Sequence, residues 1–321
     1  MLATDNFSAT YHIGGTTYYE LYKAELGLDK ENVASLEEKN NSELSKTRTT
    51  AVIKRVFPRE ARRGDVFTTE LEMLTICKHR NIVTLLGVCD EGSEMILVVE
   101  HASNGYLDEY LFNIKYRPIL SWAKRLKICL DVGHALNYLH YEMENQKTII
   151  NCDIRSGTIA LDENWGAKIV DFGFSIFLPP NLDALHLNCI LGHECSIDPE
   201  YEDTGKLKRE SDVYSFGVVL FEILCGRVAN DDEFTRESDK GLAFVIRRCF
   251  HEGTLKEMID PIIKNECTNK DSLDVFIKIA YQCLAKTQDQ RPTMKVVIKE
   301  LEKALTLQVS QDTFCLYSFS T

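Results

Sequence analysis

Strand-like segments dominate the first hundred residues of this chain, and helix-like segments dominate the rest. Residues 50–55 and 95–99 are short, β-branched runs bounded by polar residues, which is typical of strands. The turn signal Asn104-Gly105 separates them from long amphipathic stretches. The sequence therefore predicts an α+β protein with a small antiparallel-sheet part and a larger, mainly helical part. A cleft between two such parts is a common place for a ligand.

Apolar spacing predicts where the main elements lie. One helix, residues 66–77, interrupts the strands and carries Glu70. Ser121 is a favourable N-cap for a helix that runs to about Tyr141. Two short strand-like runs follow, at 158–161 and 168–170. Three more helices are expected, over residues 211–225, 271–286 and 293–305. The polar stretch from Gly27 to Thr49 is predicted to be a long solvated loop.

Composition narrows the class of function. The net charge of −12 argues against non-specific binding of nucleic acid or of an anionic membrane. The 11 cysteines include no Cys-x-x-Cys pair, which favours reduced thiols in a cytosolic protein. The N-terminus resembles neither a signal peptide nor a myristoylation site, and the longest apolar run is too short to span a bilayer. We expect a cytoplasmic protein without direct membrane insertion, recruited to the plasma membrane only through a partner.

Five segments that could carry catalytic or binding residues follow one another along the chain, and none is decisive alone. A lysine at the end of a strand is usually exposed, and Asp-Phe-Gly is usually a turn. Their order, however, matches the protein-kinase signature set, whereas the phosphate-binding motif of P-loop enzymes is absent. The five signals are the segment Ala51-Val52-Ile53-Lys54, the helix with Glu70, Asp153 in a polar loop, Asp171-Phe172-Gly173 and Asp198-Pro199-Glu200.

The chain resembles plant receptor-like kinases over almost its whole length. The resembling segments are 3–8 before the domain, 97–107 at the interlobe hinge, 211–220 in the central helix of the large lobe and 290–294 at the start of the final helix. The resemblance implies a two-lobed protein-kinase fold over residues 1–306, followed by a C-terminal tail at 307–321. The N-lobe would cover about 8–100 and the C-lobe about 105–306.

The resemblance also implies a site for ATP and Mg²⁺. Lys54 would hold the α- and β-phosphates, and Glu70 would hold Lys54 through an ion pair. Asp171 would bind the metal, and Asp153 would accept the proton of the substrate hydroxyl. The other expected nucleotide contacts are Ile13, Gly14, Leu21, Ala51, Val99, Glu100 and Ala102. Glu200 and Arg291 resemble the buried ion pair that braces the large lobe.

Departures from the family pattern begin in the glycine-rich loop. Its three glycine positions read Gly14, Thr16 and Tyr19, so a bulky ring stands where the backbone must approach phosphate. In the catalytic loop, Asn151 and Cys152 replace the histidine and arginine before the aspartate. Both changes are expected to weaken nucleotide binding or catalysis.

Two further replacements affect the catalytic and metal positions. Arg155 keeps the positive charge of the family's lysine but not its point geometry. Thr158 replaces the asparagine that provides the second metal ligand, and its reach is shorter. A threonine hydroxyl does bind Mg²⁺ in P-loop enzymes, so this replacement leaves activity open.

The usual phosphorylation switch is missing from the sequence. Residues 176–195 contain no Ser, Thr or Tyr, and Cys152 stands where an arginine would grip a phosphate. We hypothesise that activation-loop phosphorylation does not switch this domain on. His193 stands where the family has a threonine beside the catalytic aspartate, and a lone histidine is more often structural than catalytic.

Two functions follow from these features. The favoured one is a pseudokinase or weak kinase that acts through its ATP cleft and through protein contacts in plant receptor signalling. The alternative is an active serine/threonine kinase that transfers the γ-phosphate of ATP to a protein hydroxyl. Either function implies a protein partner or substrate, such as a receptor or another kinase, and no nucleic acid.

Overall fold

The computed structural model describes residues 2–28, 47–57, 63–144, 147–266 and 268–318. Contacts within the chain divide it into two compact units. The first, here called the sheet unit, comprises residues 1–78 and 83–101, and the second, the helical unit, comprises 79–82 and 102–321. Most of the loop expected between Gly27 and Thr49 lies outside the described residues.

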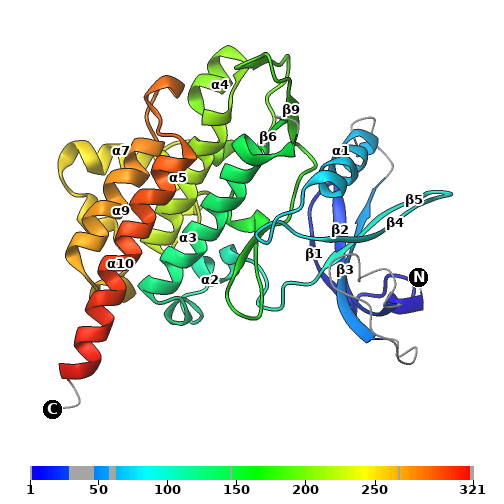
Figure 1. Cartoon of the computed structure of the whole chain (residues 1–321), viewed down its shortest axis with the longest axis horizontal. Coiled ribbons are helices and arrows are strands. Elements are labelled where there is room, and N and C mark those ends of the chain that lie inside the picture. Colours follow the sequence, from blue (N-terminus) through cyan, green and yellow to red (C-terminus); the bar gives the residue numbers. More distant parts are fainter. Residues whose placement is uncertain (1, 29–46, 58–62, 145–146, 267, 319–321) are drawn as a thin grey trace. The chain divides into compact units, whose positions relative to one another are not determined.

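The described part of the sheet unit is built on five antiparallel strands in the order β1-β2-β3-β5-β4 (Figure 1). Their bounds are His12–Gly15, Tyr19–Leu28, Thr47–Val56, Leu85–Glu91 and Glu94–Glu100 for β1 to β5. A short 3₁₀ turn, Leu2–Thr4, precedes them, and helix α1, Arg63–Ile76, packs against β4. The two predicted strands are confirmed, and the predicted helix begins three residues earlier than expected.

The pairing of β2 with β3 decides which side chains share a face of the sheet. Leu21 lies opposite Lys54, and Ala24 lies opposite Ala51. Because alternate residues of a strand face opposite sides, Val52 shares the face of Lys54, whereas Ala51 lies on the other face. That other face carries a separate core cluster made of Tyr22, Ala24, Ile53 and Ile96.

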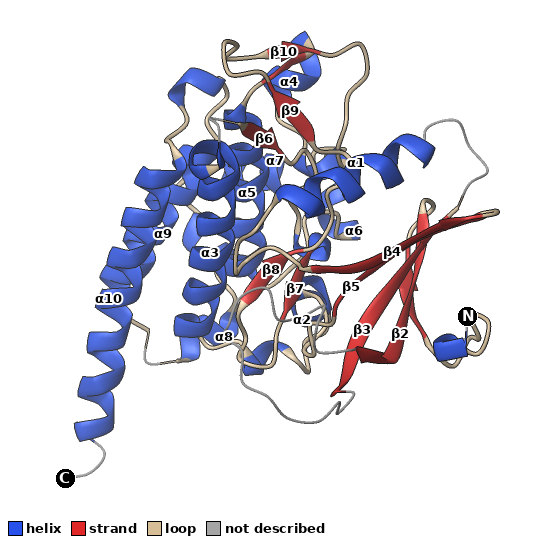
Figure 2. Cartoon of the chain, turned by 45° about the vertical axis from the view of Figure 1, so that its right-hand side comes forward, coloured by secondary structure: helices blue, strands red, loops and turns tan. Residues whose placement is uncertain are grey.

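The helical unit contains a group of long helices that pack side by side, α3, α5, α9 and α10 (Figure 2). Ser121 caps α3 by accepting the backbone N–H of Lys124, which confirms the predicted N-cap. The helices are α2 Leu107–Phe112, α3 Trp122–Asn137, α4 Pro199–Thr204, α5 Arg209–Cys225, α6 Asp232–Thr235, α7 Leu242–Glu252, α8 Pro261–Asn265, α9 Lys270–Cys283 and α10 Met294–Ser318.

Among the described residues, three two-stranded sheets accompany these helices. They pair β6 with β9, β7 with β8 and β10 with β11. Their bounds are Thr148–Ile150 for β6, Ile159–Leu161 for β7, Ala167–Ile169 for β8, Ile176–Leu178 for β9, Leu185–His186 for β10 and Lys206–Leu207 for β11. The predicted strand-like runs at 158–161 and 168–170 correspond to β7 and β8.

Two predicted helix ends are wrong. Helix α9 ends at Cys283 and not at residue 286, because the backbone at Leu284 leaves the helical region. Helix α10 continues to Ser318 and not to about 305, so it includes most of the residues assigned to a tail. Gln308 explains part of this extension, because its buried side chain accepts the backbone N–H of Asn269, just before α9. No Gly or Pro follows residue 305 to stop the helix.

The ion pair that braces the helical unit differs from the expected one. Arg291 was expected to pair with Glu200, but its Nη2 atom lies 2.5 Å from Oδ1 of Asp198, and both side chains are fully buried. Glu200 instead accepts the backbone N–H of Gln288 at 2.6 Å. Asp198 caps the N-terminus of α4 by accepting the backbone N–H of Glu200, and this position points its carboxylate inward.

Two expectations from composition concern cysteines and membranes. Within the described residues, nine cysteines are free thiols, at positions 77, 89, 129, 152, 189, 195, 225, 249 and 283. Among the helices described, none combines the length and the apolar character that a membrane span requires.

Candidate functional site

Lys54 and Glu70 form a buried ion pair in the sheet unit. The Nζ atom of Lys54 on β3 lies 2.6 Å from Oε2 of Glu70 on α1, and the two residues are 4% and 0% exposed. Burial makes this pair costly to form unless its geometry is good, so the short distance indicates a well-fixed ammonium. The ion pair expected between these two residues is present.

The ring of Tyr19 covers the same ammonium. The Nζ atom of Lys54 lies 3.8 Å from the centroid of the Tyr19 ring, well inside the range of a cation–π interaction. Tyr19 is opposite Val56 on β3, so it is the diagonal neighbour of Lys54 on one face of the sheet. Sequence analysis recognised the bulk of Tyr19 but not this contact.

The turn between β1 and β2 is held by its own backbone and by Thr16. The N–H of Thr16 donates to the carbonyl of Tyr19 at 2.8 Å, and Oγ1 of Thr16 accepts the N–H of Tyr18 at 3.1 Å. Gly14 has a φ of +153°, a conformation that favours glycine, and open space lies beside its Cα. Ile13, which precedes it, is exposed. Thr16 therefore stabilises a tight turn in place of an open glycine-rich loop.

The strand register bears on Ala51, one of the expected nucleotide contacts. Ala51 lies on the face opposite Lys54, so it is not the small residue beside the ammonium. Val52 takes that place, and sequence analysis missed it. Counting two residues back from Lys54 would have found it. Leu21 and Val99 share the face of Lys54, because they pair with Lys54 and Val52 respectively.

The two expected hinge residues are engaged locally. Glu100 is the last residue of β5. Its backbone N–H donates to the carbonyl of Thr84, and its side-chain Oε1 accepts the N–H of Thr84. The carbonyl of Ala102 accepts the N–H of Gly105 at 3.3 Å. The carboxylate of Glu100 therefore bonds Thr84 and supports the end of the strand.

Asn151 links the backbones of Asp153 and Asp171, the two expected catalytic-site aspartates, within the helical unit. Its Nδ2 donates to the carbonyl of Asp171 at 2.9 Å, and its Oδ1 accepts the N–H of Asp153 at 3.0 Å. A side-chain amide offers a donor and an acceptor at once. Asn151 thus joins the backbones of the two segments, although sequence analysis treated it as a loss. The Oδ1 atom of Asp171 accepts the N–H of Gly173 at 3.3 Å.

Asp212 supports the same loop from α5, and sequence analysis missed this role. Its two carboxylate oxygens accept the N–H groups of Asn151 and Cys152 at 2.8 and 2.9 Å, and it also bonds His140. Cys152 has a φ of +67°, which is unfavourable for a residue with a side chain. The bonds to Asp212 compensate for this strain. A buried aspartate inside an apolar helix pattern was the available signal.

Arg155 and Thr158 both bond within the catalytic loop. The Nε atom of Arg155 lies 3.2 Å from Oδ1 of Asp153. The Oγ1 of Thr158 donates to the carbonyls of Asp153 and Arg155 at 2.8 and 3.0 Å, and it accepts the N–H of Arg155. This hydroxyl therefore stabilises the loop, which leaves it a weaker candidate for a metal ligand than the carboxylate of Asp171.

The segment 176–195 is held by strand pairing and apolar contacts. β9 pairs with β6, and β10 pairs with β11. Cys152 packs against the core cluster of Ile150, Leu178, Tyr201 and Leu207, where the family has a phosphate-binding arginine. Burial raises the pKa of the Cys152 thiol well above its usual value, so it stays neutral. Burial also lowers the pKa of His193, helped by the charge of Arg155.

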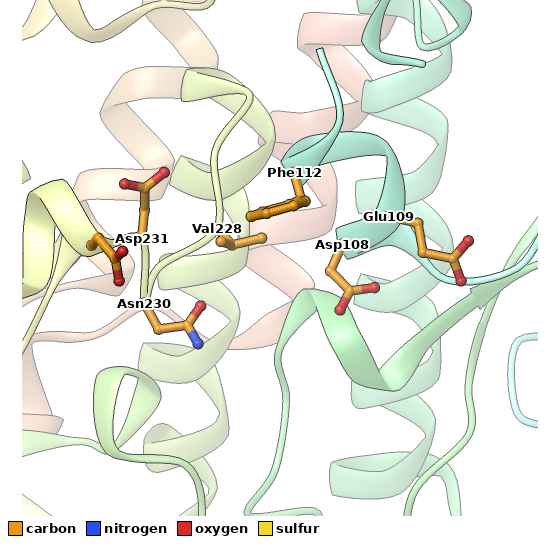
Figure 3. Close-up of a pocket in the computed structure, with 7 residues that line it drawn as sticks. Asp108, Glu109, Phe112, Val228, Asn230 and Asp231 are labelled. Carbon is orange, nitrogen blue, oxygen red and sulfur yellow. The ribbon is translucent and has the colours of Figure 1, made fainter. Parts of the chain in front are cut away.

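A separate cavity of about 460 Å³ opens between α2 and the segment that precedes α6 (Figure 3). Asp108 and Glu109 extend from α2 on one side, and Asn230 and Asp231 lie on the other. Burial raises the pKa of Asp108, and the charge of Arg155 opposes this shift. The residues that line the cavity are Asp108, Glu109, Phe112, Val228, Asn230, Asp231 and Asp232.

No group of three or more His, Cys, Asp or Glu side chains placed to hold a metal occurs among the described residues. Mg²⁺ is commonly bound through one or two carboxylates together with substrate phosphates and water. The carboxylate of Asp171 fits that kind of ligand.

The family model for protein tyrosine and serine/threonine kinases matches residues 29–301. The chain belongs to this protein-kinase family. The two-lobed kinase fold, with an antiparallel-sheet N-lobe and a helical C-lobe, is thereby confirmed. Protein kinases generally use ATP and Mg²⁺.

Similar curated proteins are plant receptor-like kinases from Arabidopsis thaliana. The chain is 40% identical to receptor-like protein kinase ANXUR2 over 265 residues, which are 82% of this chain and 30% of that protein. It is 38% identical to receptor-like protein kinase FERONIA over 311 residues, 97% of this chain and 32% of that protein. The chain thus spans about a third of the length of these relatives, and the expected receptor-like kinase resemblance is confirmed.

Proposed function

We propose that this domain binds ATP, transfers phosphate only slowly, and acts mainly through protein contacts in plant receptor signalling. The observation that carries the proposal is the buried Lys54–Glu70 ion pair at 2.6 Å. A fixed ammonium beside a sheet is the group that a kinase uses to hold the α- and β-phosphates. Bound Mg²⁺ would neutralise phosphate charge, and Asp171 would be its carboxylate ligand.

The catalytic loop supports slow transfer. Asp153 would accept the proton of the substrate hydroxyl. Arg155, however, donates a hydrogen bond to this carboxylate, and its positive charge partly offsets the negative charge of Asp153. The hydroxyl proton of Thr158 is donated to loop carbonyls, and its oxygen reaches less far toward a second metal ion than the amide oxygen of the asparagine that it replaces. The loop is therefore well ordered but is poorly equipped to complete the charge neutralisation that phosphoryl transfer needs.

The packing of Cys152 supports a domain that phosphorylation does not switch. In kinases that are activated by phosphorylation, a phosphate bound to an arginine orders the activation loop. Here the apolar contacts of Cys152 and the strand pairs of residues 176–195 would hold that segment instead. A protein partner, such as a receptor or another kinase, is the proposed regulator or substrate. The proposed location is the cytoplasm, with recruitment to the plasma membrane through that partner.

An active serine/threonine kinase is the second candidate, and Asn151 favours it. Its amide joins Asp153 to Asp171 by two hydrogen bonds, so the usual histidine is not needed to connect the two segments. In this case the γ-phosphate would pass to a protein hydroxyl at an ordinary rate.

Radiolabelled ATP separates these candidates. Autophosphorylation would be measured with Mg²⁺ and with Mn²⁺, beside Asp153→Ala as the matched inactive control. We expect slow labelling that the control abolishes, at a turnover well below the 1–100 per second of typical kinases. Labelling at an ordinary rate would favour the second candidate. A thermal-shift titration would show whether ATP raises the thermal midpoint and whether this effect requires Lys54. If ATP does not stabilise the protein in this way, both candidates are rejected.

A further inference from the structure

The Tyr19 ring lies over the Lys54 ammonium. The Tyr19 ring centroid lies 3.8 Å from Nζ, and only 4% of Lys54 is exposed. An amine that binds phosphate must be reached by a large anion that arrives through solvent. Whatever covers the ammonium must therefore move before a phosphate can contact it.

The sheet register explains why position 19 has this effect. Tyr19 pairs with Val56 and Leu21 pairs with Lys54, so Tyr19 and Lys54 occupy diagonal positions on one face. Aromatic and long side chains reach one another across such a diagonal. The carbonyl of Tyr19 also accepts the N–H of Thr16 at 2.8 Å, which anchors its backbone in the turn. The ring consequently leaves Lys54 by rotating about its own side-chain bonds.

We propose that Tyr19 competes with nucleotide phosphate for Lys54 and thereby sets the affinity of this domain for ATP. The inference rests on the proposed function, because it takes Lys54 as a phosphate ligand. The ring provides the ammonium with a neutral partner, whereas a phosphate provides charge and hydrogen-bond acceptors. The apparent affinity is reduced by the fraction of molecules in which the ring covers the amine.

Three substitutions of Tyr19 separate the effect of its aromatic face on ATP binding from the effect of its size. Tyr19→Phe keeps the ring, Tyr19→Leu keeps bulk without an aromatic face, and Tyr19→Ala removes both. The dissociation constant for ATP with Mg²⁺ would be measured by calorimetry. We expect Tyr19→Phe to match the unmodified protein and Tyr19→Ala to bind about tenfold more tightly, with Tyr19→Leu between them. Adding Lys54→Met should abolish the gain.

A second measurement works without nucleotide and without catalysis. The rate at which an amine-reactive ester labels Lys54, followed by peptide mass spectrometry, reports access to the ammonium. Tyr19→Ala and Tyr19→Leu should label faster than the unmodified protein, and Tyr19→Phe should not. The Leu variant keeps the position filled, so this comparison survives if the Ala variant folds poorly.

The outcomes distinguish the inference from the function on which it rests. If the unmodified protein binds ATP as tightly as Tyr19→Ala, the competition is refuted while ATP binding stands. If Lys54 becomes reactive but no variant binds ATP, both the competition and the proposed nucleotide function are refuted. Tighter binding that persists after Lys54→Met would also refute the competition, because the gain would then come from another contact.

Discussion

Removing the carboxylate of Asp198 should destabilise the domain far more than removing that of Glu200. Arg291 is fully buried, and its Nη2 atom lies 2.5 Å from Asp198. Asp198→Ala leaves this guanidinium without its charge partner, and breaking a buried pair in this way costs about 3–5 kcal/mol. The same change removes the N-cap of α4 and the acceptor for Ser211 and Gln288, so the upper part of that range is expected.

Glu200→Ala is the matched control, because Glu200 is the residue that the sequence suggested as the partner. It is half-buried and accepts one backbone N–H, from Gln288. Losing that bond is expected to cost about 1 kcal/mol. Urea unfolding followed by circular dichroism would compare the two variants, together with the thermal midpoint. A cost for Glu200→Ala equal to or above that of Asp198→Ala would refute the assigned pairing.

The pH dependence of stability provides an independent check on Asp198. Burial tends to raise the pKa of this carboxyl, but the hydrogen bond and charge of Arg291 outweigh burial and hold the pKa below 3.8. A lowered pKa in the folded state means that the carboxylate stabilises the fold above its unfolded pKa. That contribution is lost as the pH falls through the folded value. The acid limb of the stability profile should therefore be shallower in Asp198→Ala.

Two further substitutions test other parts of the helical unit. Burial raises the pKa of Glu222 to about 7 despite its bonds to the N–H groups of Ala229 and Ser156, so folding favours its protonated form. Stability should fall by about 3 kcal/mol as the pH rises from 4.5 to 7, and urea unfolding of Glu222→Gln should lack this slope. Gly157→Ala would place a Cβ 2.5 Å from Nη1 of Arg155, so the guanidinium should leave Asp153. We expect the rate of phosphoryl transfer to change in Gly157→Ala, whereas the thermal midpoint should not. Adding Arg155→Lys removes the guanidinium that the new Cβ would contact, so the rate should return toward that of the unmodified protein. Equal rates in the unmodified protein, the single variant and the double variant would refute the steric coupling.

Much of the fold was predictable because its signals are local. The cap at Ser121, the apolar face of α3 and the strand runs near Lys54 depend on neighbours in the chain. The ends of helices were less predictable. The extension of α10 to Ser318 depends on contacts with the segment before α9, such as the bond from Asn269 to Gln308. No local residue pattern carries that information.

Within the candidate site, the resemblance to the protein-kinase motifs sufficed to predict Lys54 and Glu70 as partners. The partner of Arg291 was mistaken because Asp198 and Glu200 are two residues apart and are chemically alike. Only the cap of α4, which turns Asp198 inward, distinguishes them. The face of the sheet on which Ala51 lies was not predicted, because it depends on how the strand residues alternate from Lys54.

The sequence alone was enough to determine the family, the two-part architecture and the residue types available for chemistry, since these depend on composition, periodicity and the order of motifs. The tertiary structure decided what those residues contact. It placed the Tyr19 ring on Lys54, the Asn151 amide between two segments and the Thr158 hydroxyl on loop carbonyls. The physical reason is that a contact requires two side chains to meet in space at a few ångströms, and strand register and helix docking set those distances.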